Sequence, residues 1–300
     1  MAESLKKMIE LGIGVGDSHL FQQDKIWSRY SQDKVDIGEK LVKVIRALHK
    51  TLPLKKPLIA ISIGSSNEPQ FRILGAAFRG GLNLLDIEKE ALNIVRERIR
   101  RQALTHVKII VGDYKKLFLD PKHASGFLKS KLKGKKINLI CLHHSMYYCN
   151  EPNWKPLFDN LYRVILAPSG AMHAVMMAAK SSDEYTTSWL YGYFAGKYFG
   201  CYNDQDLRHF SKELQDDSLF RRAGIHLERS RIRFFVNNFS EFMSVIWMIM
   251  LYPSVHKYTQ KQKEEITEFV YKKFWLKERP LIQEQDHLVV YRGINLKERV

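Results

Sequence analysis

The chain has 300 residues, a formal net charge of +16 at pH 7, a hydrophobic fraction of 45% and three cysteines. This length suits one large α/β domain with additions or two small domains, and the hydrophobic fraction is ordinary for a chain with a full core. The cysteines are too few and too far apart for a disulfide framework or a cysteine-rich zinc site, so we expect a reduced, cytoplasmic protein. The most apolar run, residues 242–252, is about half as long as a bilayer-spanning helix, and we predict no membrane span.

The positive charge favours a polyanionic partner such as RNA, DNA or acidic lipid. Lysines gather in residues 129–136, and arginines in residues 96–101 and 221–233. These groups are dispersed and lack interleaved aromatic residues or a known nucleic-acid module, so a basic surface without such a partner is an open alternative.

The first 55 residues predict helices, with apolar residues at helical spacing from Lys25 to Leu52, ahead of Pro53. Strands are then expected at residues 58–63, 82–85, 106–111, 137–142 and 170–177, with helices at 69–78, 87–103, 126–132 and 154–166 between them. This alternation predicts a mainly parallel sheet with right-handed crossovers. In such sheets the ligand lies at the carboxyl ends of the strands.

The pattern changes after the fifth strand. Residues 183–199 are rich in aromatics, and we expect a helix at 204–222, a strand at 226–236, helices at 241–251 and 259–274, and a last strand at 287–291. The whole predicts an α/β fold, with a Rossmann-like, doubly wound, mainly parallel sheet of about seven strands. We expect an N-terminal helical cap at 1–55 and one domain at 56–300, with helical insertions at about 183–222 and 239–276.

Two predicted strands end in residues that suit a nucleotide. The first strand ends in the small-residue turn Gly64–Pro69, and the second ends at Asp86, which lies 22 positions after Gly64. A tight turn lets the backbone approach a ligand, and a carboxylate roughly 20 residues further on can hold a ribose hydroxyl. A buried strand pair with a glycine turn and no ligand is the plainer alternative.

Two common nucleotide motifs are absent. Ser66 and Pro69 stand where a dehydrogenase fingerprint requires glycine, and there is no Walker sequence. A ligand with a ribose and little phosphate therefore remains, and S-adenosyl-L-methionine fits that description.

S-adenosylmethionine offers a different group to each part of the turn region. Its ribose suits Asp86, its ammonium suits Glu68, and its carboxylate suits the backbone amides of residues 65–67. Its adenine could then lie against Asp113 and Tyr114, which follow the third strand.

Four segments in this order resemble class I S-adenosylmethionine-dependent methyltransferases: residues 61–68, 85–86, 112–113 and 142–148. The stretch Gly64–Phe71 is similar to the cofactor loop of chemotaxis-receptor methyltransferases. The segment ending in Tyr147-Tyr148 and the long C-terminal insertion look more like histamine N-methyltransferase and its small-molecule relatives. The resemblance covers residues 58–178 well and the rest weakly.

The resemblance implies roles for particular residues. Asp86 would hold the ribose and Asp113 the adenine amine, while the residues that close the fourth strand would line both cofactor and acceptor. The chain departs from the family at Ser66, where a second glycine is usual, and at Ser62, where an acid often stands. The predicted cofactor-binding residues are Gly64, Ser65, Ser66, Glu68, Asp86, Ile87, Asp113, Tyr114 and His143.

Aromatic and imidazole side chains are the candidates for the acceptor side. His144 and Tyr148 are the candidate catalytic residues, and Tyr30, Tyr147 and Trp189 are candidates for acceptor binding. Adjacent histidines on a strand point to opposite faces, so His143 and His144 do not predict a metal site. Core packing of these side chains is the alternative.

These observations together predict in-line methyl transfer from S-adenosylmethionine to a nitrogen or oxygen of a small-molecule acceptor. The donor is already activated, so the protein mainly aligns the two reactants, and at most one base is needed. An RNA methyltransferase that uses the basic surface and a non-catalytic methyltransferase-like binding protein are the alternatives.

Overall fold

The computed structural model describes residues 2–16, 20–53, 56–64, 66, 68–251 and 257–296. The chain forms two compact units. Residues 35–176, 207–228 and 286–300 make up what we call the sheet unit, and residues 1–34, 177–206 and 229–285 make up the helical unit. Each unit is described by itself below.

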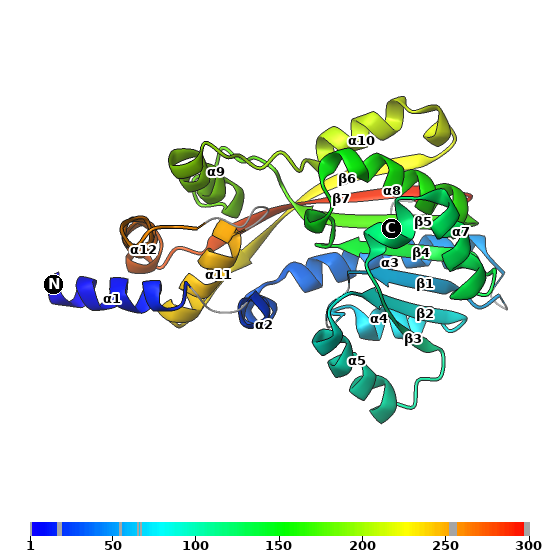
Figure 1. Ribbon diagram of the computed structural model, residues 1–300, viewed down its shortest axis with the longest axis horizontal. Coiled ribbons are helices and arrows are strands. Elements are labelled where there is room, and N and C mark those ends of the chain that lie inside the picture. The colour runs from blue at the N-terminus through cyan, green and yellow to red at the C-terminus, as the bar shows by residue number, and fades with distance from the viewer. Residues whose placement is uncertain are drawn as a thin grey trace. The chain divides into compact units, whose positions relative to one another are not determined.

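A seven-stranded sheet with the order β3-β2-β1-β4-β5-β7-β6 is the framework of the chain (Figure 1). The pairs β1–β2, β1–β4, β2–β3 and β4–β5 are parallel. The strands are β1 (Ile59–Ile63), β2 (Gly81–Asp86), β3 (Val107–Val111), β4 (Ile137–His143), β5 (Leu166–Met177), β6 (Gly224–Phe234) and β7 (Leu281–Arg292). The order reverses between β1 and β4, which is where open α/β sheets bind ligands. The predicted Rossmann-like, mainly parallel sheet is confirmed.

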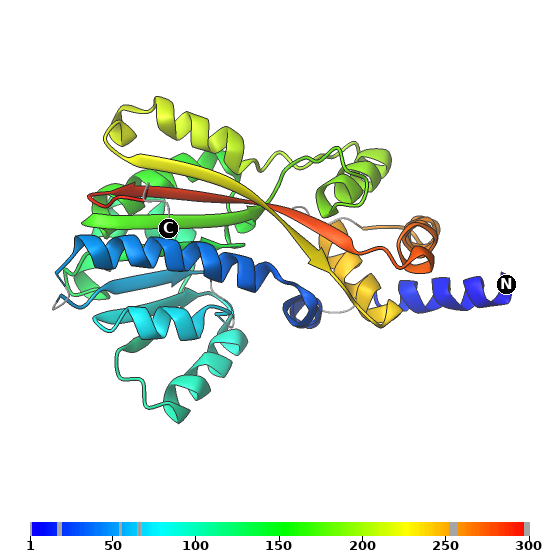
Figure 2. The same ribbon diagram turned by 180° about the vertical axis from the view of Figure 1, so that it is seen from behind.

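Helices cover both faces of the sheet unit, because side chains along each strand alternate between two cores. Ile61, Ile140 and Met172 belong to one core, and Ala60, Cys141 and Ala171 belong to the other. The first core lies under α6 (Tyr114–Phe118), α7 (Pro121–Ser130), α8 (Trp154–Asn160) and α10 (Leu207–Asp216). The second lies under α3 (Asp33–Thr51), α4 (Phe71–Ala77) and α5 (Lys89–Arg101). Figure 1 shows α7 and α8 in front of the strands, and Figure 2, seen from behind, shows α3 and α4 on the opposite face.

The helical unit has its own aromatic core. Its helices are α1 (Ala2–Gly14), α2 (Leu20–Tyr30), α9 (Thr187–Phe199), α11 (Phe239–Leu251) and α12 (Gln260–Lys273). Trp247 on α11 is buried and donates from Nε1 to the carbonyl of Gly12 at 2.8 Å, which ties α11 to α1. Throughout the described residues, every helix is too short or too polar to cross a bilayer.

The helical pattern of residues 25–52 is divided in the structure between α2 and α3. Ser31 forms an isolated bridge with Phe234, and its Oγ accepts from the Asp33 amide at 3.0 Å. The Asp33 carboxylate in turn accepts from Trp27 Nε1 at 3.0 Å. Such short-range side-chain hydrogen bonds compete with the helical ladder and end α2.

Among the strands, β5 and β7 begin furthest from the predicted residues. The fifth strand begins at Leu166 rather than at residue 170, because a register shift lets the Pro168 region lie within it as a bulge. The last strand begins at Leu281 rather than at residue 287. Its first residues were not predicted as a strand because they include Gln283 and Gln285, polar residues whose side chains are buried. The sequence also missed α6, which Asp113 caps.

Candidate functional site

A tight turn after β1 forms the centre of the candidate site. Gly64 has φ +65°, and its N–H donates to the carbonyl of Leu85 at 2.8 Å, which continues the ladder to β2. A Cβ at this position would lie 2.4 Å from the Cβ of Ser145, a distance that real atoms do not tolerate. Ser66 and Glu68 also have positive φ. Only glycine suits position 64, and the turn as a whole is strained.

The carboxylate that ends β2 lies at this turn. Asp86 Oδ2 accepts from the Ser66 amide at 2.6 Å, and Oδ1 accepts from the Glu88 amide at 2.8 Å. The Asp86 side chain is buried among these amides. The structure therefore brings together the predicted residues Gly64, Ser66 and Asp86. Ser65, together with the predicted backbone contact at residue 67, lies outside the described residues.

Glu68 is a buried acid in the same turn. One carboxylate oxygen, Oε1, accepts from the Gln70 amide at 3.0 Å, while Oε2 has no hydrogen-bond partner among the described residues. Burial raises the pKa of Glu68 to about 7. The carboxyl group is thus close to half-ionised near neutral pH, and a nearby cation would favour its charged form.

The loop after β3 contributes two predicted residues with different surroundings. Asp113 caps α6, since its Oδ1 accepts from the Lys115 amide at 2.9 Å. The Tyr114 hydroxyl donates to the carbonyl of Ser145 at 2.9 Å, and burial raises the pKa of this phenol. Tyr114 therefore links the loop after β3 to the loop after β4. Ile87, which follows Asp86, is 67% exposed and presents an apolar side chain at the same edge of the sheet.

The loop after β4 holds the predicted histidines and tyrosines. His144 has φ +52°, and its amide donates to the carbonyl of Val175 at 2.8 Å. Its ring stacks on Tyr147 with centroids 6.1 Å apart, and Tyr148 is half exposed. His143 Nε2 lies 3.2 Å from Nδ1 of His173 on β5. The two adjacent histidines thus have separate partners, and no group of metal-ligating side chains occurs in the described part of the chain.

The two remaining acceptor-side candidates belong to the helical unit. The Tyr30 hydroxyl donates to Glu241, and this hydrogen bond raises the pKa of the phenol. Trp189 stacks on Tyr193 with centroids 4.9 Å apart, and the Lys273 ammonium lies 5.8 Å from the Trp189 ring centroid. Both residues are thus placed within that unit, and their role in acceptor binding stays a prediction.

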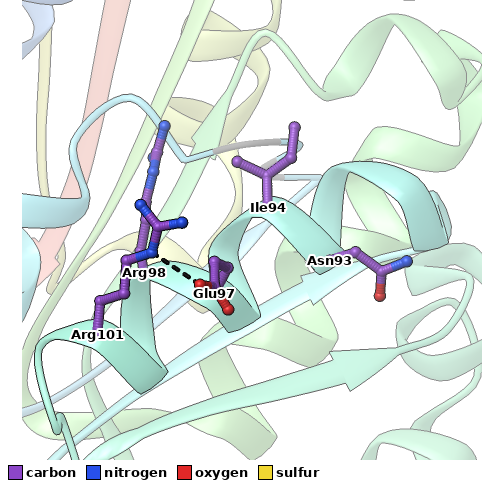
Figure 3. A pocket seen from close by; sticks show the side chains of 5 residues that line it. All are labelled: Asn93, Ile94, Glu97, Arg98 and Arg101. Atoms are coloured by element: carbon purple, nitrogen blue, oxygen red, sulfur yellow. Dashed lines mark hydrogen bonds and ion pairs between the residues drawn. The ribbon is translucent and has the colours of Figure 1, made fainter.

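A shallow surface hollow lies elsewhere, along α5 (Figure 3). All of its lining side chains come from this one helix, and Arg101 Nε donates to Glu97 Oε1 at 2.7 Å across it. The hollow is lined by Asn93, Ile94, Glu97, Arg98 and Arg101. None of these was predicted as a site residue, and a hollow on the side of one exposed helix does not offer the convergent groups of a ligand site.

Solved structures with a similar fold were found, although no protein-family model and no curated protein matches the chain. The YcgJ protein of Bacillus subtilis is 10% identical, with a TM-score of 0.51 over 83% of this chain and 97% of that chain. A Bacillus halodurans C-125 protein assigned as a methyltransferase is 15% identical, with a TM-score of 0.50 over 83% of this chain and 98% of that chain. The plantazolicin methyltransferase BamL, solved with S-adenosylhomocysteine (SAH), is 12% identical, with a TM-score of 0.48 over 97% of this chain and 99% of that chain.

At these identities the likeness concerns the fold. The chain has a seven-stranded, Rossmann-like architecture similar to that of the Bacillus halodurans protein, in agreement with the predicted fold. Fold alone does not assign an activity, which has to be argued from the site. One residue of the site was missed from the sequence. Ser145, whose Cβ faces Gly64, carries no signal in a single sequence, because a serine after two histidines is unremarkable until the loops are brought together.

Proposed function

We propose that this chain is a cytoplasmic S-adenosylmethionine-dependent methyltransferase that acts on a nitrogen or oxygen of a small molecule. The observation that carries the proposal is the position of Asp86, whose carboxylate is held at the glycine turn by the Ser66 and Glu88 amides. Each carboxylate oxygen has a second lone pair, so Asp86 can accept ribose hydroxyls while it keeps these bonds.

The other turn residues suit the same ligand. Glu68 has a buried carboxylate oxygen with no hydrogen-bond partner among the described residues, which suits an ammonium group. The exposed side chain of Ile87 would cover one face of the adenine, and Asp113 and Tyr114 would border its edge. A sulfonium donor supplies an activated methyl group, and the protein needs only to align it with the acceptor and to receive a proton.

The acceptor side is proposed from the loop after β4. The segment ending in Tyr147 and Tyr148 resembles histamine N-methyltransferase, and its rings and the neighbouring His144 could hold a small aromatic or cationic acceptor. Tyr30 and Trp189, which were predicted from the sequence, are also proposed as acceptor-binding residues. A panel of amines and phenols, assayed for methylation, would identify the acceptor class.

Calorimetry with S-adenosylhomocysteine tests the cofactor proposal. We expect the wild type to bind and Asp86→Ala to lose at least ten-fold in affinity, because two ribose hydrogen bonds of about 1 kcal/mol each are removed. Asp120→Ala is the matched control, since that aspartate also accepts from two backbone amides, those of Lys122 and His123 at the start of α7. No binding by the wild type, or equal binding by both variants, would refute the proposal.

RNA is a second candidate acceptor, and the basic surface favours it. Lys129, Lys131, Lys133 and Lys135 are exposed in the α7–β4 segment of the sheet unit. A protein that neutralises several phosphates loses affinity steeply as salt rises. Salt-dependent RNA binding would support this candidate, and indifference to RNA would remove it. Cofactor binding without methylation of any acceptor would instead indicate a non-catalytic binding protein.

A further inference from the structure

A line of three imidazoles and one carboxylate runs through the sheet unit from the candidate site. His143 Nε2, at the end of β4, lies 3.2 Å from His173 Nδ1 on β5. His173 Nε2 lies 3.3 Å from His287 Nδ1 on β7, and His287 Nε2 lies 2.8 Å from Asp36 Oδ2 on α3. Each ring joins the next through its two nitrogens, so the groups form a chain and do not converge on one point as metal ligands do.

The sheet explains why the four residues meet. Strands β4, β5 and β7 are neighbours, and each histidine lies two residues from a member of the core under α3, namely Cys141, Ala171 and Val289. Side chains two residues apart share a face of a strand, so all three imidazoles point towards α3. His173 and His287 are fully buried, whereas the Asp36 side chain is 14% exposed and His143 is half-buried. Both ends of the imidazole chain are therefore accessible to solvent, whereas His173 and His287 in its middle are shielded from water.

The carboxylate sets the direction of every hydrogen bond in this chain. An ionised Asp36 can only accept, so His287 must donate from Nε2 and keep a lone pair on Nδ1. His173 must then donate to it from Nε2, and His143 must donate from Nε2 to His173 Nδ1. The proton of each neutral ring is thus on Nε2. The lone pair of His143 is on Nδ1, which makes no hydrogen bond within the described residues.

The two rings nearest the site are held neutral. Burial lowers the pKa of His143 to about 3 and the pKa of His173 well below its ordinary value. Nearby charges do not reverse this effect, because the Lys40 ammonium and the neighbouring imidazoles also disfavour a positive ring. A proton that enters at His143 is therefore stable only where a counter-charge is present, and in this chain the counter-charge is Asp36. Ionisable groups beside these four residues, in the part of the protein that the structure describes, include His144 and Lys40, which is ion-paired with Glu228, and Asp286, which precedes His287 and pairs with Arg208.

We propose that His143 is the base of the reaction and that the imidazole chain carries the accepted proton's charge to His287, where Asp36 pairs with it. This inference rests on the proposed methyl transfer. The acceptor's N–H or O–H proton would move to His143 Nδ1 as the acceptor's electron pair forms a bond to the methyl carbon. The bond between that carbon and the sulfonium sulfur would break at the same time, with its electron pair left on sulfur. The Nε2 proton of His143 passes to His173 Nδ1, and the Nε2 proton of His173 passes to His287 Nδ1. His287 then has two N–H groups beside Asp36, and the proton returns to water by the reverse path after the product leaves.

In this scheme His143 touches the acceptor, whereas His173, His287 and Asp36 are positioning residues that act through it. His144, the sequence candidate for the base, is instead stacked on Tyr147.

Nitrogen-15 NMR of the imidazoles in the ligand-free protein tests the order of the chain without any activity. We expect all three rings to carry their proton on Nε2 at neutral pH. In Asp36→Asn the amide can donate as well as accept, so this uniform Nε2 order should be lost. A His143 ring with its proton on Nδ1, or an unchanged order in Asp36→Asn, would overturn the proposal.

A kinetic comparison tests whether the chain serves the reaction. Glu39→Gln is the matched control for Asp36→Asn, because Glu39 is an exposed acid on the same helix and the same charge is removed. With an amine or phenol that the wild type methylates, we expect kcat of Asp36→Asn to fall ten-fold or more at neutral pH. S-adenosylhomocysteine affinity should stay unchanged. Raising the pH should restore the rate, since an acceptor that is already deprotonated needs no base, whereas a merely misfolded site would not recover.

His287→Gln is the second variant, because glutamine can donate and accept but cannot carry a proton. Equal kcat of Asp36→Asn, His287→Gln and the Glu39→Gln control across the pH range would overturn the relay. Failure of the proposed function would be seen separately, as a wild type that binds no S-adenosylhomocysteine.

Discussion

Replacing Gly64 with alanine tests the turn on which the candidate site depends. Gly64 has φ +65°, and a non-glycine residue in this region pays roughly 1–2 kcal/mol. The new Cβ would lie 2.4 Å from the Cβ of Ser145, so the two segments would have to separate. They resist separation because the Gly64 amide is bonded to Leu85 and the Ser145 carbonyl accepts from Tyr114. Such overpacking costs about 1–3 kcal/mol, and the sum is about 2–5 kcal/mol.

Denaturant unfolding measures this loss as a shift of the midpoint with an unchanged slope. Gly126→Ala is the matched control, because Gly126 lies in the exposed helix α7 and a Cβ there would meet nothing within 4 Å. That control should gain about 0.5–1 kcal/mol. Combining Gly64→Ala with Ser145→Gly should recover the part due to overpacking and leave the part due to backbone strain. If Gly64→Ala unfolds at the wild-type midpoint, the geometry argued for this turn is wrong.

Three further predictions concern the acid in the turn, the exposed edge of the site and the helical unit. Burial raises the pKa of Glu68 from its ordinary 4.5 in the unfolded chain to about 7 in the folded protein. The buried carboxylate charge therefore does not destabilise the fold below the unfolded-state pKa and destabilises it fully above the folded-state pKa. Stability should therefore fall by about 3 kcal/mol as pH rises through this window, and Glu68→Gln should flatten the dependence; parallel curves would contradict this. Ile87→Ser should change stability by under about 0.5 kcal/mol but weaken S-adenosylhomocysteine binding about five-fold, as measured by calorimetry, because Ile87 is exposed. Thr259→Ala removes the capping box of α12 and should cost about 1 kcal/mol in a denaturant titration while cofactor affinity is kept.

The sequence was sufficient for the sheet because periodicity and loop chemistry agreed there. Apolar runs ended at Gly64, Asp86 and Gly112, and the strands that carry them lie side by side with those residues at one edge. The predicted strand boundaries were wrong where pairing with a neighbouring strand outweighed the local sequence preference. Pro168 lies in a bulge of β5, ahead of residue 170 where the strand was predicted to begin, and the polar start of β7 is buried. Neither feature could be predicted from the sequence. A proline is tolerated in a strand at a bulge, and a buried glutamine needs a hydrogen-bond partner, and both depend on segments that are distant in the sequence.

In the candidate site, too, residues close together in the sequence could be predicted, whereas residues brought together from distant segments could not. The spacing of Gly64 and Asp86 is a local signal, and the bond from the Ser66 amide to Asp86 joins the two ends. The imidazole chain had no such signal, since His173 and His287 are separated from His143 by 30 and 144 positions. Only the strand order β4-β5-β7, with α3 over that face, aligns the rings with Asp36.

The last residues of β4 connect the two parts of the mechanism. Ser145, which leaves no room for a side chain at Gly64, comes two residues after His143, whose ring begins the imidazole chain. Between them His144 is fixed by its positive φ and by its amide bond to Val175, so the segment has little freedom to yield. A side chain at position 64 would therefore push on the segment that holds His143. Gly64→Ala should disturb the His143 tautomer as well as cofactor affinity, whereas Asp36→Asn should disturb the tautomer alone.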